Sequence, residues 1–239
     1  MSTIPNFRLL DKFESIFVNG PYLHRDSSIG NLIATQIYED LYYLAKSNKY
    51  CERVGNKSHA IRISGGLTGI TARRADGTFG ERNPSVPAVD EPRYNVSRSK
   101  LATVEIGVEV KIMMKAMIKQ IDRVIGDMKK QVEEFRRGGG APISVGIVGV
   151  NFADQTTTYE RERINATDGK IYKHPIQEAS KAMERLEKLA KPSFDEFLFL
   201  SFKASNVSPF DFEWVDEKAT LAEYAAILTR ICRKYEKRF

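Results

Sequence analysis

The chain has 239 residues, of which 42% are hydrophobic and 28% charged, and this composition is typical of a folded protein with one substantial core. No stretch approaches the roughly 18 apolar residues that span a bilayer, and the first residues lack a secretory signal, so we expect a cytoplasmic protein without membrane contact. Two cysteines and three scattered histidines disfavour a disulfide framework and a zinc site, and the net charge of +6 permits nucleic-acid binding without requiring it.

The first half of the chain predicts one helix, two strands and a loop. A capping sequence followed by apolar residues at helical spacing predicts a helix over about 26–48. Strands are predicted over 59–64 and 69–77, the second with Asp76 near its end. Three prolines then indicate a loop or insertion over about 78–98.

The second half alternates buried strands with amphipathic helices. The apolar patterns predict strands over 101–112, 143–150 and 197–202, and helices over about 113–137, 174–189 and 219–237. Strands that alternate with helices pair in parallel, whereas closely spaced strands form an antiparallel meander. We therefore expect an α/β fold with a mixed central β-sheet flanked by helices, in a single domain over residues 1–239 with its core at about 27–203.

The third strand carries an acid and a base on one face. Strand alternation places Val104, Ile106, Val108, Val110 and Ile112 on one side, and Thr103, Glu105, Gly107, Glu109 and Lys111 on the other. The carboxylate of Glu109 and the ammonium of Lys111 are thus predicted to share one patch. Half-buried strands often display such charges to water, so the triplet alone does not establish a site.

The order of elements and charged residues resembles the PD-(D/E)xK nuclease superfamily, which has the restriction-endonuclease-like fold. The matching features are a helix, a three-strand meander with an acid before the third strand, Glu-x-Lys on that strand, and then a helix and a strand. Here the matching residues are Asp76, Glu109 and Lys111, and the resemblance covers roughly residues 29–152.

The resemblance implies a metal-dependent phosphodiesterase. Asp76 and Glu109 would bind Mg²⁺, for which Mn²⁺ can substitute, and the carbonyl of Val110 would add a third oxygen ligand. Lys111 would contact the attacking water and offset negative charge beside it. Asp90 is an alternative to Asp76 as the first acid, although its Val-Asp-Glu-Pro context is typical of a turn.

Two further polar residues complete the predicted site. Glu39 on the first helix matches an acid that supports the metal in many members of the superfamily, and a small change in helix phase would replace it with the adjacent Asp40. Gln120 lies near the buried stripe of the helix after the motif, where it either reaches the active site or is an ordinary hydrogen-bonded glutamine.

Basic and aromatic residues surround the predicted loop. They either follow a phosphate backbone and stack on bases or belong to an ordinary solvated loop. The group comprises Arg73, Arg74, Arg82, Arg93, Arg98, Lys100, Phe79 and Tyr94. The basic residues on or beside the helix after the motif are interspersed with acids, which indicates a solvated outer face. Lys115, close to the motif, is the one to test for contact with phosphate.

The resemblance implies an endonuclease that cuts double-stranded DNA, acts as a homodimer and serves phage defence as a type II restriction enzyme. One alternative is a defence or repair nuclease without strict sequence preference, or one activated by a small ligand. Another is a non-catalytic nucleic-acid-binding module with the same fold.

Overall fold

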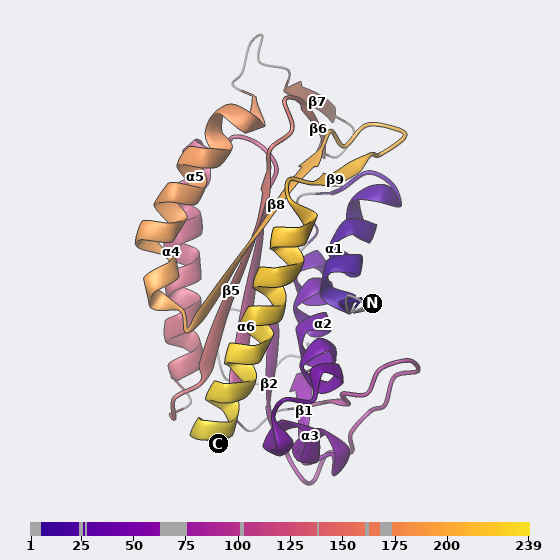
Figure 1. Cartoon of the computed structure of the whole chain (residues 1–239), viewed down its shortest axis with the longest axis vertical. Helices are drawn as coiled ribbons and strands as arrows, with labels where there is room; N and C mark the ends of the chain where they lie inside the picture. The colour runs from indigo at the N-terminus through magenta and orange to yellow at the C-terminus, as the bar shows by residue number, and fades with distance from the viewer. Residues whose placement is uncertain are drawn as a thin grey trace.

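A seven-stranded mixed sheet lies between two layers of helices in the computed structural model, which describes residues 6–23, 26, 28–62, 76–100, 103–137, 139–160, 163–167 and 174–239 (Figure 1). The strand order is β3-β1-β2-β4-β5-β8-β9, and β6 and β7 form a separate hairpin. The predicted α/β class with a mixed central sheet is confirmed. Within the described ranges, no helix is both long and apolar enough to cross a bilayer.

The elements have the following bounds. The strands are β1 (His59–Arg62), β2 (Gly77–Glu81), β3 (Arg98–Ser99), β4 (Ile106–Met113), β5 (Ile143–Asn151), β6 (Thr156–Glu160), β7 (Arg163–Thr167), β8 (Glu196–Ala204) and β9 (Phe212–Trp214). The helices are α1 (Arg8–Val18), α2 (Ser28–Leu44), α3 (Asn48–Gly55), α4 (Met117–Arg136), α5 (Pro175–Leu189) and α6 (Glu217–Arg238), with a 3₁₀ turn η1 at Lys191–Ser193.

The pairing changes direction at β4. β1, β2 and β4 form an antiparallel meander, whereas β4, β5 and β8 pair in parallel, as the spacing of the elements predicts. β9 adds an antiparallel strand at the edge. β4 is therefore bordered by an antiparallel neighbour on one side and a parallel neighbour on the other.

Each face of the sheet is covered by its own helices, because the central strands are apolar on both sides. All nine residues of β5 are buried. α1, α2 and α6 pack on one face and α4 and α5 on the other, and each layer forms a separate apolar cluster with the sheet (Figure 1). α4 packs closely on β4, since a Cβ added at Gly107 would come within 2.6 Å of the Phe135 ring.

The structure differs from the sequence prediction at the second strand. Asp76 directly precedes β2, and residues 78–81 are strand rather than loop. The prediction failed there because the prolines that suggested a loop begin only at Pro84. Of the predicted strand over 69–77, residues 69–75 lie outside the described residues. α1, α3 and the β6–β7 hairpin were not predicted.

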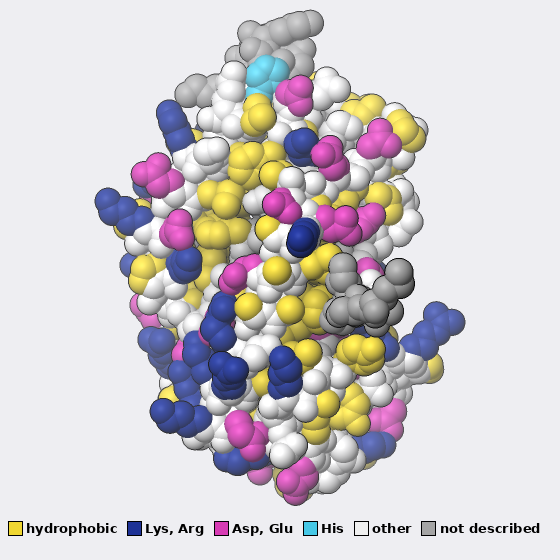
Figure 2. All heavy atoms as spheres, in the orientation of Figure 1, with side chains coloured by type: hydrophobic (Ala, Val, Ile, Leu, Met, Phe, Trp, Pro, Cys, Tyr) yellow, Lys and Arg dark blue, Asp and Glu magenta, His cyan; other side chains and the backbone are white. Residues whose placement is uncertain are grey.

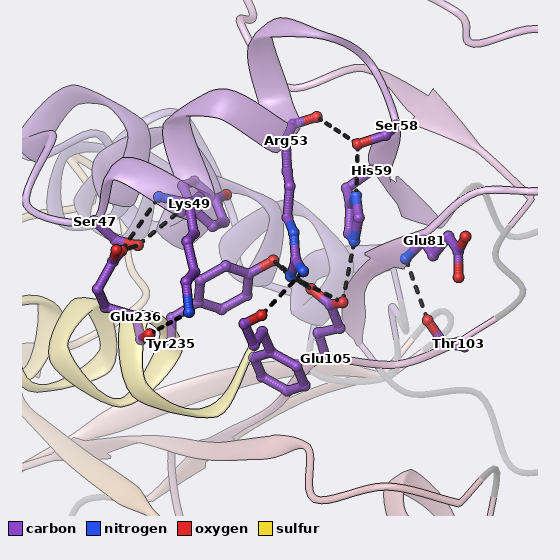
Figure 3. Close-up of polar contacts among 12 residues, drawn as sticks. Ser47, Lys49, Arg53, Ser58, His59, Glu81, Thr103, Glu105, Tyr235 and Glu236 are labelled. Carbon is purple, nitrogen blue, oxygen red and sulfur yellow. Dashed lines mark hydrogen bonds and ion pairs between the residues drawn. The ribbon is translucent and has the colours of Figure 1, made fainter.

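The side chain of Glu105 does not follow the predicted alternation of β4. Glu105 precedes the strand, and its carboxylate accepts hydrogen bonds from His59 Nε2 at 3.0 Å, from Arg53 Nη1 at 3.0 Å and from the Tyr235 hydroxyl (Figure 3). Arg53 also donates to the Tyr235 hydroxyl at 2.9 Å. This buried cluster ties α3, β1 and α6 to the start of β4 and so holds the strand that carries Glu109 and Lys111.

Candidate active site

A pocket of about 290 Å³ opens at the carboxyl end of β4. In open α/β sheets, ligands bind outside the carboxyl ends of the parallel strands, and β4 is the first strand of the parallel half. The wall residues come from the start of α2, the end of β4, the first turns of α4 and the β6–β7 hairpin. They include Tyr22, Asp26, Ile29, Gly30, Asp76, Val110, Lys111, Lys115, Gln120, Arg123 and Thr158.

Asp76 reaches this pocket from the start of β2. Its Oδ2 accepts a hydrogen bond of 2.8 Å from the backbone amide of Val110, the residue between Glu109 and Lys111. In an extended strand the N–H and C=O of one residue point to the same side, so the Val110 carbonyl also points toward Asp76. The start of β2 and the end of β4 therefore place an acid beside the Glu-x-Lys sequence.

Glu109 and Lys111 lie on the same face of β4, as alternation predicts. Glu109 is only 4% exposed and its Oε1 accepts a hydrogen bond from Lys111 Nζ. Its second oxygen, Oε2, is buried without a hydrogen-bond partner among the described residues. The side chain of Lys111 lines the pocket and is 29% exposed. Glu109 does not itself line the pocket; its neighbours Val110 and Lys111 do, so a buried carboxylate oxygen with unused acceptor capacity adjoins the pocket.

Both acids of the site have pKa values above those of free carboxyl groups. Burial raises the pKa of Glu109 to about 7, and the nearby charge of Asp76 acts in the same direction, while Lys111 opposes both. Burial also raises the pKa of Asp76, against the opposing effects of Lys111 and the Val110 amide. Two desolvated carboxylates with one ammonium leave an excess of negative charge, which a cation or a proton would neutralise.

Asp90, the alternative first acid, lies elsewhere. Its side chain is exposed and accepts hydrogen bonds from Lys57 Nζ at 2.5 Å and Ser97 Oγ at 2.6 Å. The structure therefore brings Asp76, and not Asp90, beside Glu109.

The two acids of the first helix do not reach the pocket. Both oxygens of Glu39 are occupied, since they accept from the backbone amides of Asn95 and Val96 at 2.9 Å. Asp40 accepts from the amides of Arg8 and Leu9, which open α1, and from the Tyr224 hydroxyl. Helix phase alone could not reveal that Glu39 and Asp40 stabilise the 95–96 loop and the start of α1.

Gln120 does lie at the pocket, together with Lys115 and Arg123. Gln120 Oε1 accepts a hydrogen bond of 3.1 Å from Arg123 Nη2. Lys111, Lys115 and Arg123 thus place three cationic side chains at the pocket, of which Lys111 acts on the two acids and Arg123 pairs with Asp127.

Several described members of the predicted basic and aromatic cluster are engaged within the fold. Phe79 is fully buried in the core, and the Arg98 guanidinium, itself buried, lies 4.8 Å from the centre of the Tyr94 ring. Arg82 donates to backbone carbonyls of Lys57 and Val86. Arg73 and Arg74 lie outside the described residues.

A second gathering of basic residues covers the lower half of α6 (Figure 2). Arg230 and Lys234 form ion pairs with the buried Glu196, and Arg238 pairs with Asp195. These cations pair with carboxylates of the same face, as Lys111 and Arg123 at the pocket pair with Glu109 and Asp127.

Sequence reasoning missed Gly30, which brings the α2 backbone against Asp76. A Cβ at Gly30 would overlap the Asp76 carboxylate. The signal was present, because a glycine within a helical pattern is unfavourable unless another group approaches closely. Tyr22 and Thr158, by contrast, left no pattern in the sequence that indicated the pocket.

Comparison of the chain with family models, with curated proteins and with solved structures finds no match.

Proposed function

We propose that the protein is a metal-dependent endonuclease that hydrolyses DNA phosphodiester bonds at this pocket. The observation that carries the proposal is the placement of Asp76 and the buried, partly unpaired carboxylate of Glu109 beside Lys111. This arrangement matches the acid-acid-lysine set of the PD-(D/E)xK nucleases, which the order of strands and helices also resembles.

The donor set fits a magnesium ion. Among the described residues, no group of three or more His, Cys, Asp or Glu side chains is arranged to hold a metal. Mg²⁺ in phosphoryl-transfer sites is commonly held by one or two carboxylates together with waters and phosphate oxygens, so Asp76 and Glu109 suffice. The Val110 carbonyl would supply a further hard oxygen. When bound, the ion would neutralise charge on the phosphate and lower the pKa of a water ligand.

Lys111 has the second role in the proposed reaction. Its ammonium is held by Glu109 while it lines the pocket, so it can donate a hydrogen bond to the attacking water or to a phosphate oxygen. Because Lys111 also stabilises the ionised carboxylates around it, its removal would affect both the water and the electrostatics of the two acids.

The remaining cations of the pocket favour a polyanionic substrate. Lys115 and Arg123 lie where they can contact phosphates on either side of the one being cut. The net charge of +6 supports the same class of substrate.

The test is cleavage of supercoiled plasmid with Mg²⁺ or with EDTA. We expect cutting by the wild type only with Mg²⁺, and a loss of at least about 100-fold in Lys111→Ala and Asp76→Asn. Asp90→Asn is the matched control, because it removes an exposed acid from the same part of the chain and should cut normally. Equal activity of D76N and D90N would refute the assignment.

The pattern of products separates the nuclease types. Discrete bands would support a type II restriction enzyme, which we favour, and a smear would support a nuclease without strict sequence preference. Glu39 and Asp40 form structural hydrogen bonds, so two of the predicted acids remain at the site. Because the site lacks the third acid that the resemblance implied, the second candidate is a non-catalytic DNA-binding module. Metal-dependent cutting that K111A abolishes, with the fold intact, would exclude it.

A further inference from the structure

We propose that the β6–β7 hairpin is an arm that contacts the groove of duplex DNA held at the pocket. This inference rests on the proposed function and adds the form of the substrate and the residues that recognise it. It begins from Thr158, which belongs to β6, is almost fully buried and lines the pocket.

The register of the hairpin identifies which of its residues face the same way as Thr158. Thr158 lies opposite Asn165 on β7, and residues directly opposite in an antiparallel pair point to the same face. Arg163 is two residues from Asn165 and shares that face. Asn165 and Arg163 therefore lie on the face of the hairpin that carries Thr158 at the pocket.

This face emerges from the protein into solvent. Thr167 at the base of β7 is buried, whereas Asn165 and Arg163 are exposed. Ile164 on the opposite face is 71% exposed. β6 is buried at Thr156, Thr157 and Thr158, whereas β7 is exposed from Arg163 to Ala166, so β7 is the strand of the hairpin that a partner can reach.

The base of the hairpin is nevertheless fixed relative to the pocket. The amide of Thr157 donates to the Ser205 carbonyl at 2.8 Å. The buried Asn206 side chain donates to the Thr157 carbonyl at 2.7 Å and also bonds both the amide and the carbonyl of Tyr22, another pocket residue. Asn206 thus holds two walls of the pocket in one arrangement.

Duplex DNA is the partner that fits these features. A two-stranded β-ribbon can enter the major groove, which is roughly 12 Å wide, and Arg and Asn side chains read base edges there. Arg163 on the arm and Lys111, Lys115 and Arg123 at the pocket supply cations for phosphate contacts, although Glu160 lies opposite Arg163 on β6 and Arg123 pairs with Asp127. A duplex whose backbone enters the pocket would offer its groove to the exposed face of the hairpin.

The test is binding of a fluorescent 30-base-pair duplex of random sequence, without added metal, to the full chain. We expect the affinity of Arg163→Ala/Asn165→Ala to fall at least about tenfold, because it loses a cation and a base contact. Ile164→Thr, on the opposite face of the same strand, is the control and should bind within about twofold of the wild type.

Two results would overturn the inference. One is wild-type duplex affinity in R163A/N165A. The other is an equal loss of affinity for the duplex and for a single-stranded 30-mer, because a single strand presents no groove. Plasmid cutting is scored separately: failure of the wild type to cut refutes the proposed activity, whereas the binding comparison requires no cutting.

Discussion

Replacement of Glu109 by glutamine should stabilise the protein while it removes the proposed metal site. The pKa of Glu109 rises from 4.5 to about 7 on folding, mainly because the carboxylate is buried. Its ionisation therefore opposes folding, and the free energy of unfolding falls as the pH rises from about 4.5 through 7. The difference between the two pKa values corresponds to about 3 kcal/mol above pH 7.

Glutamine preserves the size of the side chain and carries no charge. We expect E109Q to exceed the wild type by about 1–3 kcal/mol in free energy of unfolding at pH 8, and to match it at pH 4, where Glu109 is protonated. The gain is below the full 3 kcal/mol because Lys111 loses its partner. Urea titrations followed by the fluorescence of the single tryptophan, Trp214, measure this difference across the pH range.

Mg²⁺ should reverse the order of stability. A ligand that binds only the folded state stabilises it, so saturating Mg²⁺ should raise the denaturation midpoint of the wild type and leave that of E109Q unchanged. Glu184→Gln on the exposed side of α5 is the control and should follow the wild type throughout. A metal-free E109Q less stable than the wild type at pH 8 would show that Glu109 is a structural acid and would refute the reasoning.

Further substitutions test the surroundings of the site. Gly30→Ala should displace the Asp76 carboxylate and lower Mg²⁺-dependent cutting at least about tenfold, with a melting temperature within a few degrees of the wild type. Burial raises the pKa of Asp40 to about 6, so the free energy of unfolding of the wild type should fall between about pH 4 and 6, and Asp40→Asn should abolish this fall. Asp40→Ala should lower the free energy of unfolding by about 1–3 kcal/mol, because α1 loses its cap. Urea titrations measure both effects. In the same titrations, Glu105→Ala should lower the free energy of unfolding by about 3 kcal/mol, because Arg53 is left without its acid. Tyr235→Phe should lower it by about 1 kcal/mol, because one hydrogen bond is lost.

The sequence predicted the elements whose burial is regular. An unbroken apolar run predicted β5, and apolar residues at helical spacing predicted the buried stripe of α4. Both elements occur where expected. The antiparallel meander and the parallel half followed from the spacing of strands and helices. α1 was missed although its pattern is amphipathic, and its first amides are capped by Asp40 from α2, which no local pattern reveals.

The site was predictable where one strand supplies two residues and less so where separate segments meet. Alternation was enough to place Glu109 beside Lys111. The choice between Asp76 and Asp90 required the pairing of β2 with β4, which brings residue 76 next to the Val110 amide. Glu39 could not be placed because its orientation depends on the 95–96 backbone, about 56 residues away in the chain.

The contrast between Glu109 and the other buried acids is the strongest argument for its function. Four other buried acids use both carboxylate oxygens to accept hydrogen bonds from parts of the chain distant in sequence, so each of them stabilises the fold. They are Glu39, Asp40, Glu105 and Glu196. Among the described residues, Glu109 bonds Lys111 alone, two residues away, and its Oε2 is buried without a partner; Glu134, which pairs with Arg137 outside the pocket, is the other acid with a buried oxygen in that state. A buried acceptor without a donor costs about 1–3 kcal/mol, and folding gains nothing from it. Under the proposed function, a cation bound at that oxygen would offset the cost, so the stability of E109Q with and without Mg²⁺ would distinguish a metal-binding acid from a structural one.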